Sequence, residues 1–170
     1  MLNLRLVGNI IIIIFLVVLQ TFVFSKINFQ QMATPYVYIL FILLYSIKQN
    51  RYLFLLLCFL LGWGVDFLSY TGGIHTFACL TIGILVLPLL RMVYGKRKFE
   101  IDEFRFSDLS GIQWVIYTVI LVVIHHFLIF FLESFSFSNI KGILLKTIYC
   151  SLFTLIFVYS YLILFRKKAE

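Results

Sequence analysis

Six apolar stretches, separated by short polar segments, dominate the pattern of this 170-residue chain. A helix needs about 20 apolar residues to cross the hydrocarbon core of a bilayer. The pattern predicts six transmembrane helices at about residues 6–24, 33–47, 52–70, 75–91, 112–132 and 143–165. The second span is the shortest, and Pro35 suits the first turn of its helix. We therefore expect an all-α, polytopic membrane helix bundle that forms one integral membrane domain over residues 1–170.

Composition supports this class. Hydrophobic residues make up 63% of the chain and charged residues 12%, whereas soluble domains are about 45–50% apolar and about 25% charged. The net charge of +7 does not indicate nucleic-acid binding, because the basic residues lie at the ends of the spans. The three cysteines are odd in number and lack CxxC or Cys/His spacing, so we expect no disulfide framework, metal site or cofactor.

The distribution of basic residues predicts the orientation of the spans. Cytoplasmic loops carry an excess of Lys and Arg. With both termini cytoplasmic, eleven basic residues lie inside and three outside. The three outside residues are Lys26, Lys141 and Lys146. Six spans with both ends in the cytoplasm is therefore the predicted topology.

Asp66 is the most unusual residue of the third span. An Asp near the bilayer centre costs roughly 3 kcal/mol on insertion scales, and the preceding Leu and Phe residues each return about 0.5 kcal/mol. Gly72 and Gly73 can end the helix sharply just after it. We hypothesise that Asp66 locks the hairpin between spans three and four, either by accepting the first amides of the fourth helix or by pairing with His75. The alternative is a proton- or solute-binding Asp.

Other residues are candidates for contacts between helices. Gly62 and Gly64 flank Trp63 and favour close helix packing. His125 and His126 lie in the middle of the fifth span, where adjacent residues point about 100° apart and cannot easily ligate one metal. We expect one of them to hydrogen-bond within the bundle and the other to reach a neighbouring helix or a partner protein. Motifs typical of enzymes, such as a Walker A loop, HExxH or paired carboxylates, are lacking, so we expect a non-enzyme.

The loop at residues 94–111 mixes basic, acidic and aromatic residues. It is either a solvated connector with a basic foot near anionic headgroups or a docking surface for a cytoplasmic partner.

The segment from Gly62 to His75 follows the pattern G-x-G-x-D-x-x-x-x-x-x-G-I-H. Together with the six-span plan, it resembles the rod-shape-determining protein MreD family. In that family a Gly-rich span carries an Asp, followed by a turn and a "GLHA"-like start to the next helix. The matching positions here are Gly62, Asp66, Gly73 and His75. Thr76 replaces the usual small apolar residue, and Gly72 lies where many members have Pro.

The resemblance implies a scaffold or adaptor subunit of the bacterial cell-elongation machinery, in the inner membrane and in contact with membrane lipid. It implies association with an MreC-like bitopic protein, and through it with MreB filaments, RodA and a class B penicillin-binding protein. The six-helix plan is also similar to the S components of energy-coupling-factor transporters. The alternative function is therefore a vitamin-binding membrane subunit, which needs a polar pocket open to the outside.

Overall fold

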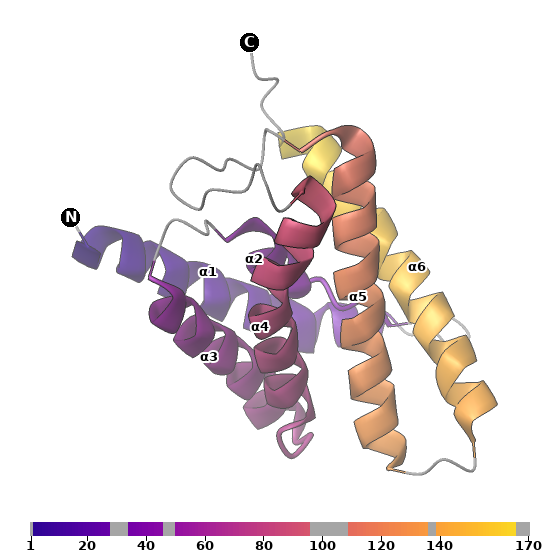
Figure 1. Cartoon of the computed structure of the whole chain (residues 1–170). Helices are drawn as coiled ribbons and strands as arrows, with labels where there is room; N and C mark the ends of the chain where they lie inside the picture. Colours follow the sequence, from indigo (N-terminus) through magenta and orange to yellow (C-terminus); the bar gives the residue numbers. More distant parts are fainter. Residues whose placement is uncertain (1, 28–33, 46–49, 96–108, 136–138, 166–170) are drawn as a thin grey trace.

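The computed structural model describes residues 2–27, 34–45, 50–95, 109–135 and 139–165, and these residues form helices without a strand (Figure 1). The elements in chain order are α1 Leu2–Phe22, the 3₁₀ turn η1 Phe24–Lys26, α2 Ile39–Leu44, α3 Arg51–Ser69, α4 Ile74–Tyr94, α5 Gly111–Ser134 and α6 Ile140–Phe165. Five helices are long and apolar enough to cross a membrane. The described residues indicate an all-helical, multi-pass membrane protein, which confirms the all-α membrane class expected from hydropathy. Six spanning helices were expected, and five are long enough among the described residues.

The four helices α3 to α6 form two consecutive antiparallel hairpins (Figure 1). At one end, called here the hairpin end, α3 and α5 finish and α4 and α6 begin. At the opposite end, Gln113 Nε2 donates to the Val93 carbonyl over 3.0 Å and ties the start of α5 to the last turn of α4. The Ser110–Gln113 capping box fixes the start of α5.

The helix in the second predicted span is much shorter than predicted. A helix was expected over residues 33–47, but α2 contains only six residues, Ile39–Leu44. Pro35 has no amide hydrogen, and the residues from Thr34 to Val37 are not helical. We call Thr34–Tyr45 the crossing segment.

The crossing segment runs back alongside α1. Its first part meets Gln20, near the end of α1. Its last part lines a groove with residues of the first half of α1, Asn9 and Ile12 among them, and the Tyr45 ring stacks on Phe54 in the first turn of α3 with centroids 4.7 Å apart. Residues 34–45 thus pass through the interior of the bundle between α1 and α3, with only the short helix α2 among them.

Backbone groups of the crossing segment find side-chain partners on other helices. The Val37 amide donates to Gln20 Oε1 over 2.9 Å, and Gln20 Nε2 donates to the Pro35 carbonyl over 3.1 Å. The Tyr36 amide donates to Thr154 Oγ1 over 2.9 Å. Irregular backbone at membrane depth is tolerated only where protein or a water-filled cavity surrounds it. Gln20, which is 2% exposed, therefore supplies this segment with the backbone hydrogen bonds that a neighbouring strand supplies in a sheet.

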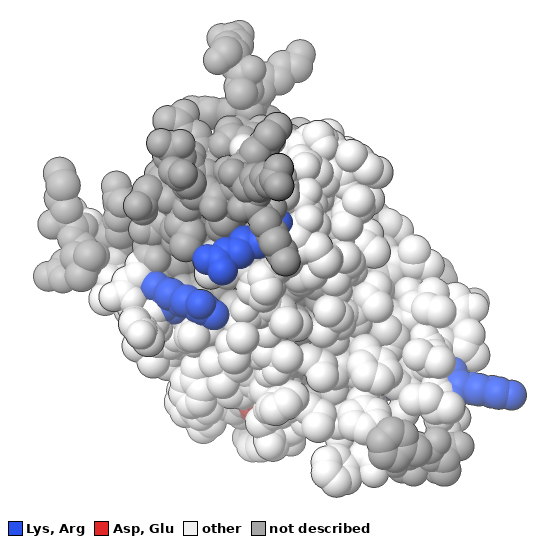
Figure 2. Space-filling model, in the orientation of Figure 1, with Lys and Arg blue, Asp and Glu red and all other residues white. Residues whose placement is uncertain are grey.

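The surface of the bundle is mainly uncharged. On the face drawn in Figure 2, most of the described surface is uncharged, with Lys and Arg at the upper left and at the right edge and a small acidic spot at the lower left. Among the described residues, the acidic ones are Asp66, which is 6% exposed, and Glu133. A charge-poor perimeter of this kind is suited to contact with lipid.

Candidate functional site

The turn between α3 and α4 is built on left-handed backbone. Tyr70 ends α3 with φ 56°, and its amide donates to the Asp66 carbonyl. Gly72 and Gly73 follow with φ values of 66° and 99°. Glycine adopts these angles without the steric penalty of a side chain. The turn places the first amides of α4 beside the last turn of α3.

The Asp66 carboxylate accepts four hydrogen bonds inside this hairpin. Its Oδ1 accepts from the Thr71 hydroxyl over 2.5 Å and from the His75 amide over 3.0 Å. Its Oδ2 accepts from the Thr76 amide over 2.8 Å and from the Thr76 hydroxyl over 2.6 Å. The first amides of a helix lack intrahelical partners, and the positive end of the helix dipole favours an anion there. Asp66 thus caps α4 from the neighbouring helix.

Gly62 lets the two helices of the hairpin approach closely. A Cβ at this position would lie 2.5 Å from Thr76 Cα and 2.7 Å from the His75 carbonyl oxygen, both backbone atoms. Gly64 serves a different contact, because its Cβ would meet the Val17 side chain of α1 at 3.1 Å. Gly62 and Gly64 therefore face different helices.

His75 connects the hairpin to a second polar cluster. The Tyr38 hydroxyl lies 2.8 Å from His75 Nδ1 and 3.0 Å from His125 Nε2. Tyr38 and His125 are fully buried. The Tyr36 ring lies among the three imidazoles, with centroid distances of 5.4 Å to His75 and 5.2 Å to His126. Two adjacent histidines of α5 and one of α4 thus surround the crossing segment.

His126 holds α5 to α6. Its Nδ1 lies 2.8 Å from the Val122 carbonyl, and its Nε2 lies 3.0 Å from Thr154 Oγ1. A carbonyl only accepts, so Nδ1 carries the hydrogen and Nε2 accepts from the Thr154 hydroxyl. Thr154 in turn accepts the Tyr36 amide. Both histidines of the pair therefore bond within the bundle, whereas a partner protein was also considered for one of them.

The same reasoning assigns donor and acceptor in the two hydrogen bonds that the Tyr38 hydroxyl makes to His75 and His125, called here the Tyr38 bridge. His125 Nδ1 is buried and has no hydrogen-bond partner among the described residues. A buried donor without a partner is costly, so we assign the hydrogen of His125 to Nε2, which donates to the Tyr38 oxygen. Tyr38 then donates to His75 Nδ1. All three imidazoles can be neutral in this arrangement, and each Tyr38 contact pairs one donor with one acceptor.

The structure brings Gly62, Asp66 and His75 together at the hairpin, with Gly72 and Gly73 in the turn. Within the described ranges, no group of three His, Cys, Asp or Glu side chains is arranged to hold a metal ion. Sequence reasoning missed four partners: Gln20, Tyr36, Tyr38 and Thr154. Only Thr154 could have been found from the sequence pattern. Polar residues recur at helical spacing on a buried face of α6, at Thr147, Ser151 and Thr154.

We expect Tyr38→Phe to lower the free energy of unfolding by about 1–3 kcal/mol, because it leaves buried imidazole nitrogens without their partner. Unfolding of the purified chain in mixed micelles, followed by circular dichroism, measures this change. Tyr159→Phe is the matched control. It removes the contact with Thr118, whose hydroxyl retains the Trp114 carbonyl at 2.8 Å. An equal loss in the two variants would contradict a special role for the Tyr38 bridge.

Comparisons of this chain with family models, curated proteins and solved structures gave no match.

Proposed function

We propose that this protein is a non-enzymatic scaffold or adaptor subunit of a bacterial cell-elongation machinery, located in the inner membrane. It binds an MreC-like bitopic partner through contacts between helices inside the membrane, and through that partner it joins MreB, RodA and a class B penicillin-binding protein. The proposal extends the resemblance of the Gly62–His75 motif to the MreD family.

The hydrogen bonds that the Asp66 carboxylate accepts support this proposal most directly. An intramembrane carboxylate that binds a proton or a solute needs acceptor capacity left for its ligand. Here both carboxylate oxygens already accept two hydrogen bonds each, from Thr71, His75 and Thr76. The most conspicuous charge of the chain therefore serves the architecture of the hairpin, as a scaffold requires.

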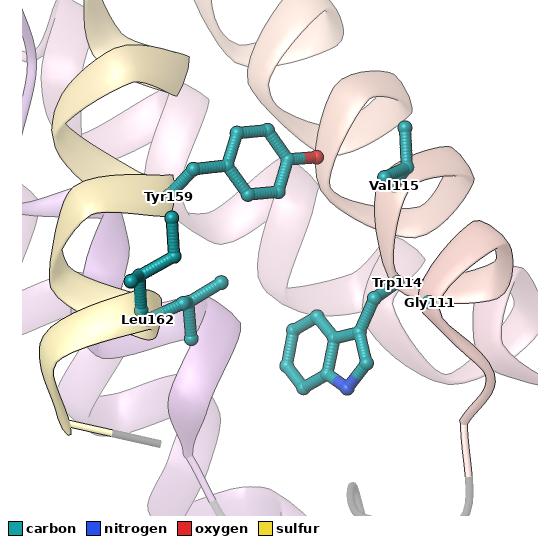
Figure 3. A pocket seen from close by; sticks show the side chains of 6 residues that line it. Gly111, Trp114, Val115, Tyr159 and Leu162 are labelled. Carbon is teal, nitrogen blue, oxygen red and sulfur yellow. The ribbon is translucent and has the colours of Figure 1, made fainter.

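Apolar grooves on the bundle surface also suit a scaffold. One groove of about 320 Å³ lies between α1 and α3, with Ile13, Val17 and Phe67 among its lining residues. Another of about 310 Å³ lies between α5 and α6, and Figure 3 shows the rings of Trp114 and Tyr159 in it. Such surfaces fit an apolar helix or an acyl chain, whereas a vitamin-binding S component needs converging polar groups.

The orientation of the helices in the membrane is part of the same proposal. Both termini face the cytoplasm, with eleven basic residues inside and three outside. The crossing segment provides the return from the outer end of α1 to the inner end of α3. The loop at 94–111, considered either as a connector or as a docking surface, lies mostly outside the described residues.

Co-purification tests the proposal. The tagged chain is co-expressed with an MreC-like protein that has one span and a periplasmic coiled coil, and it is then extracted in mild detergent. We expect the partner to be retained in a fixed ratio. The control is the same partner with its transmembrane helix replaced by an unrelated apolar helix, which should be lost.

A ligand-binding measurement distinguishes the scaffold proposal from the alternative function, a vitamin-binding transporter subunit. The purified chain is titrated with a panel of labelled B vitamins. Saturable binding of one vitamin, without retention of the bitopic partner, would show a transporter subunit and overturn the scaffold proposal.

A further inference from the structure

Two aromatic residues adopt the left-handed backbone conformation, in which side chains are disfavoured. Tyr70 has φ 56° and Phe135 has φ 43°, and they are the non-glycine residues with positive φ in the described part of the chain. In this conformation the Cβ atom of a residue with a side chain lies too close to the following carbonyl oxygen. Gly or Asn is the usual solution at a helix C-terminus. An aromatic ring at each position therefore calls for a compensating contact.

The rings find little contact within the chain. Tyr70 is 94% exposed and Phe135 is 83% exposed. Both follow the last residue of a helix, α3 and α5 respectively, and these helices finish at the same end of the bundle (Figure 1). The two exposed rings thus occupy equivalent places at the hairpin end.

Each of these residues ends an aromatic series that continues along its helix. Below Tyr70, Trp63 and Phe67 stack with centroids 5.5 Å apart, and both are more than half exposed. Below Phe135, Phe127 and Phe131 stack with centroids 5.8 Å apart. Trp63 and Tyr70 are seven residues apart and therefore lie on nearly the same face of α3.

Two observations place the rings at the boundary of the hydrocarbon. The 19 residues of α3 rise about 28 Å, close to the hydrocarbon thickness of about 30 Å, so Tyr70 lies where α3 leaves the core. Beside Phe135, Glu133 and Lys146 form an ion pair over 3.0 Å, with 55% and 43% of their side chains exposed. Such an exposed pair belongs at the polar headgroup level, because charges in the hydrocarbon are costly.

We propose that Tyr70 and Phe135 are membrane-interface anchors, whose rings insert among the lipid headgroups at the hairpin end and fix the depth of the two hairpins. Tyr and Trp are enriched at this level of membrane proteins, and Phe135 supplies a flat aromatic ring of similar size. Contact of the rings with lipid compensates for the backbone conformation at both turns. The lipid surface is the partner of these rings, and this inference does not depend on the proposed scaffold function.

Tryptophan fluorescence tests this placement. The chain has two tryptophans, so Trp63→Phe leaves Trp114, which is 6% exposed, as a constant background. Tyr70→Trp and Phe135→Trp are introduced separately into that background. The full chain is reconstituted in phosphatidylcholine–phosphatidylglycerol vesicles whose acyl chains carry bromine near the carbonyl or near the methyl end. Quenching of the added tryptophan is compared for the two lipids and for aqueous iodide.

We expect the added tryptophan to be quenched about twofold or more by shallow bromine relative to deep bromine, because the ring lies at headgroup level. In a separate sample of the unsubstituted chain, Trp63 lies about 10 Å deeper along α3 by helical rise. It should favour the deeper bromine, and that sample serves as the depth reference. Strong iodide quenching without lipid quenching would place the rings in water and overturn the proposal. So would shielding that develops only when a bitopic partner is added, because the rings would then contact protein.

The two positions are independent, so a variant that fails to reconstitute leaves the other as the test. Shallow quenching at one position and aqueous quenching at the other would overturn the proposal of a paired anchor.

Discussion

Replacing Gly62 with alanine should lower the free energy of unfolding by about 3 kcal/mol, the upper part of the range for overpacking. The added methyl group would lie 2.5 Å from Thr76 Cα and 2.8 Å from the Thr76 nitrogen. These atoms belong to the backbone of α4 and cannot move aside as a side chain would. The helices must separate, and the His75 and Thr76 amides then move away from the Asp66 carboxylate. One methyl group therefore disturbs both packing and capping.

Reversible unfolding in mixed micelles measures this loss, and two glycines serve as controls. A Cβ at Gly8 of α1 meets nothing within 4 Å, so Gly8→Ala should be neutral or stabilising by up to about 1 kcal/mol. A Cβ at Gly83 meets the Cys58 sulfur at 2.9 Å, a side-chain atom, so Gly83→Ala should give an intermediate loss. Equal stability of the Gly62 and Gly8 variants would show that α3 and α4 are not packed this closely.

Replacing Asp66 with alanine should lower the free energy of unfolding by about 3–5 kcal/mol, because buried donors lose their acceptor. The Thr71 and Thr76 hydroxyls can turn to other acceptors, but the amides of His75 and Thr76 cannot. The loss is therefore assigned mainly to these two amides. The same unfolding measurement in mixed micelles tests it.

Asp66→Asn separates hydrogen bonding from charge. Its single carbonyl oxygen can retain the Thr76 amide, while its NH₂ group faces the His75 amide and loses that bond. We therefore expect a loss of about 1–3 kcal/mol, between the wild type and the alanine variant. Glu133→Ala removes the other acidic residue of the described ranges, whose exposed pair with Lys146 should contribute at most about 1 kcal/mol. If Asp66→Asn is as unstable as Asp66→Ala, the negative charge matters more than the count of hydrogen bonds.

Hydropathy was sufficient to predict the long helices. The predicted spans at 52–70, 75–91 and 112–132 differ by only a few residues from α3, α4 and α5. The reason is that a lipid environment requires continuous apolar helix, so length and composition carry most of the information. A solvated loop places no comparable constraint on sequence, which is why the boundaries are less well predicted than the cores.

The crossing segment shows where hydropathy fails. Residues 35–47 are as apolar as a helix would be, and Pro35 is compatible both with a first helical turn and with the non-helical backbone found at Thr34–Val37. Their conformation depends on Gln20 and Thr154, which are distant in sequence and accept or donate the hydrogen bonds that a helix would form internally. Such long-range partners cannot be read from a local pattern.

The candidate site likewise has a part that local sequence predicts and a part that depends on residues distant along the chain. Asp66 attracts attention because a carboxylate is unfavourable in an apolar helix, and its hydrogen-bond partners lie within ten residues along the chain. The Tyr38 bridge joins residues 37 and 87 positions apart. Tyrosine in an apolar stretch is common in membrane proteins, so Tyr38 gave no signal until the fold placed it between two imidazoles.

The partners of the crossing segment impose an order on biogenesis. A six-residue helix is too short to be integrated by a translocon as an independent span. The Tyr36 amide, in the non-helical part of the crossing segment, donates to Thr154 of α6, which is synthesised 118 residues later. The hydrogen bonds of residues 34–45 can therefore be completed only after α6 has been inserted. A nascent chain that stalls before α6 would leave the Tyr36 amide without Thr154, and we expect such a chain to be a substrate for membrane quality-control proteases.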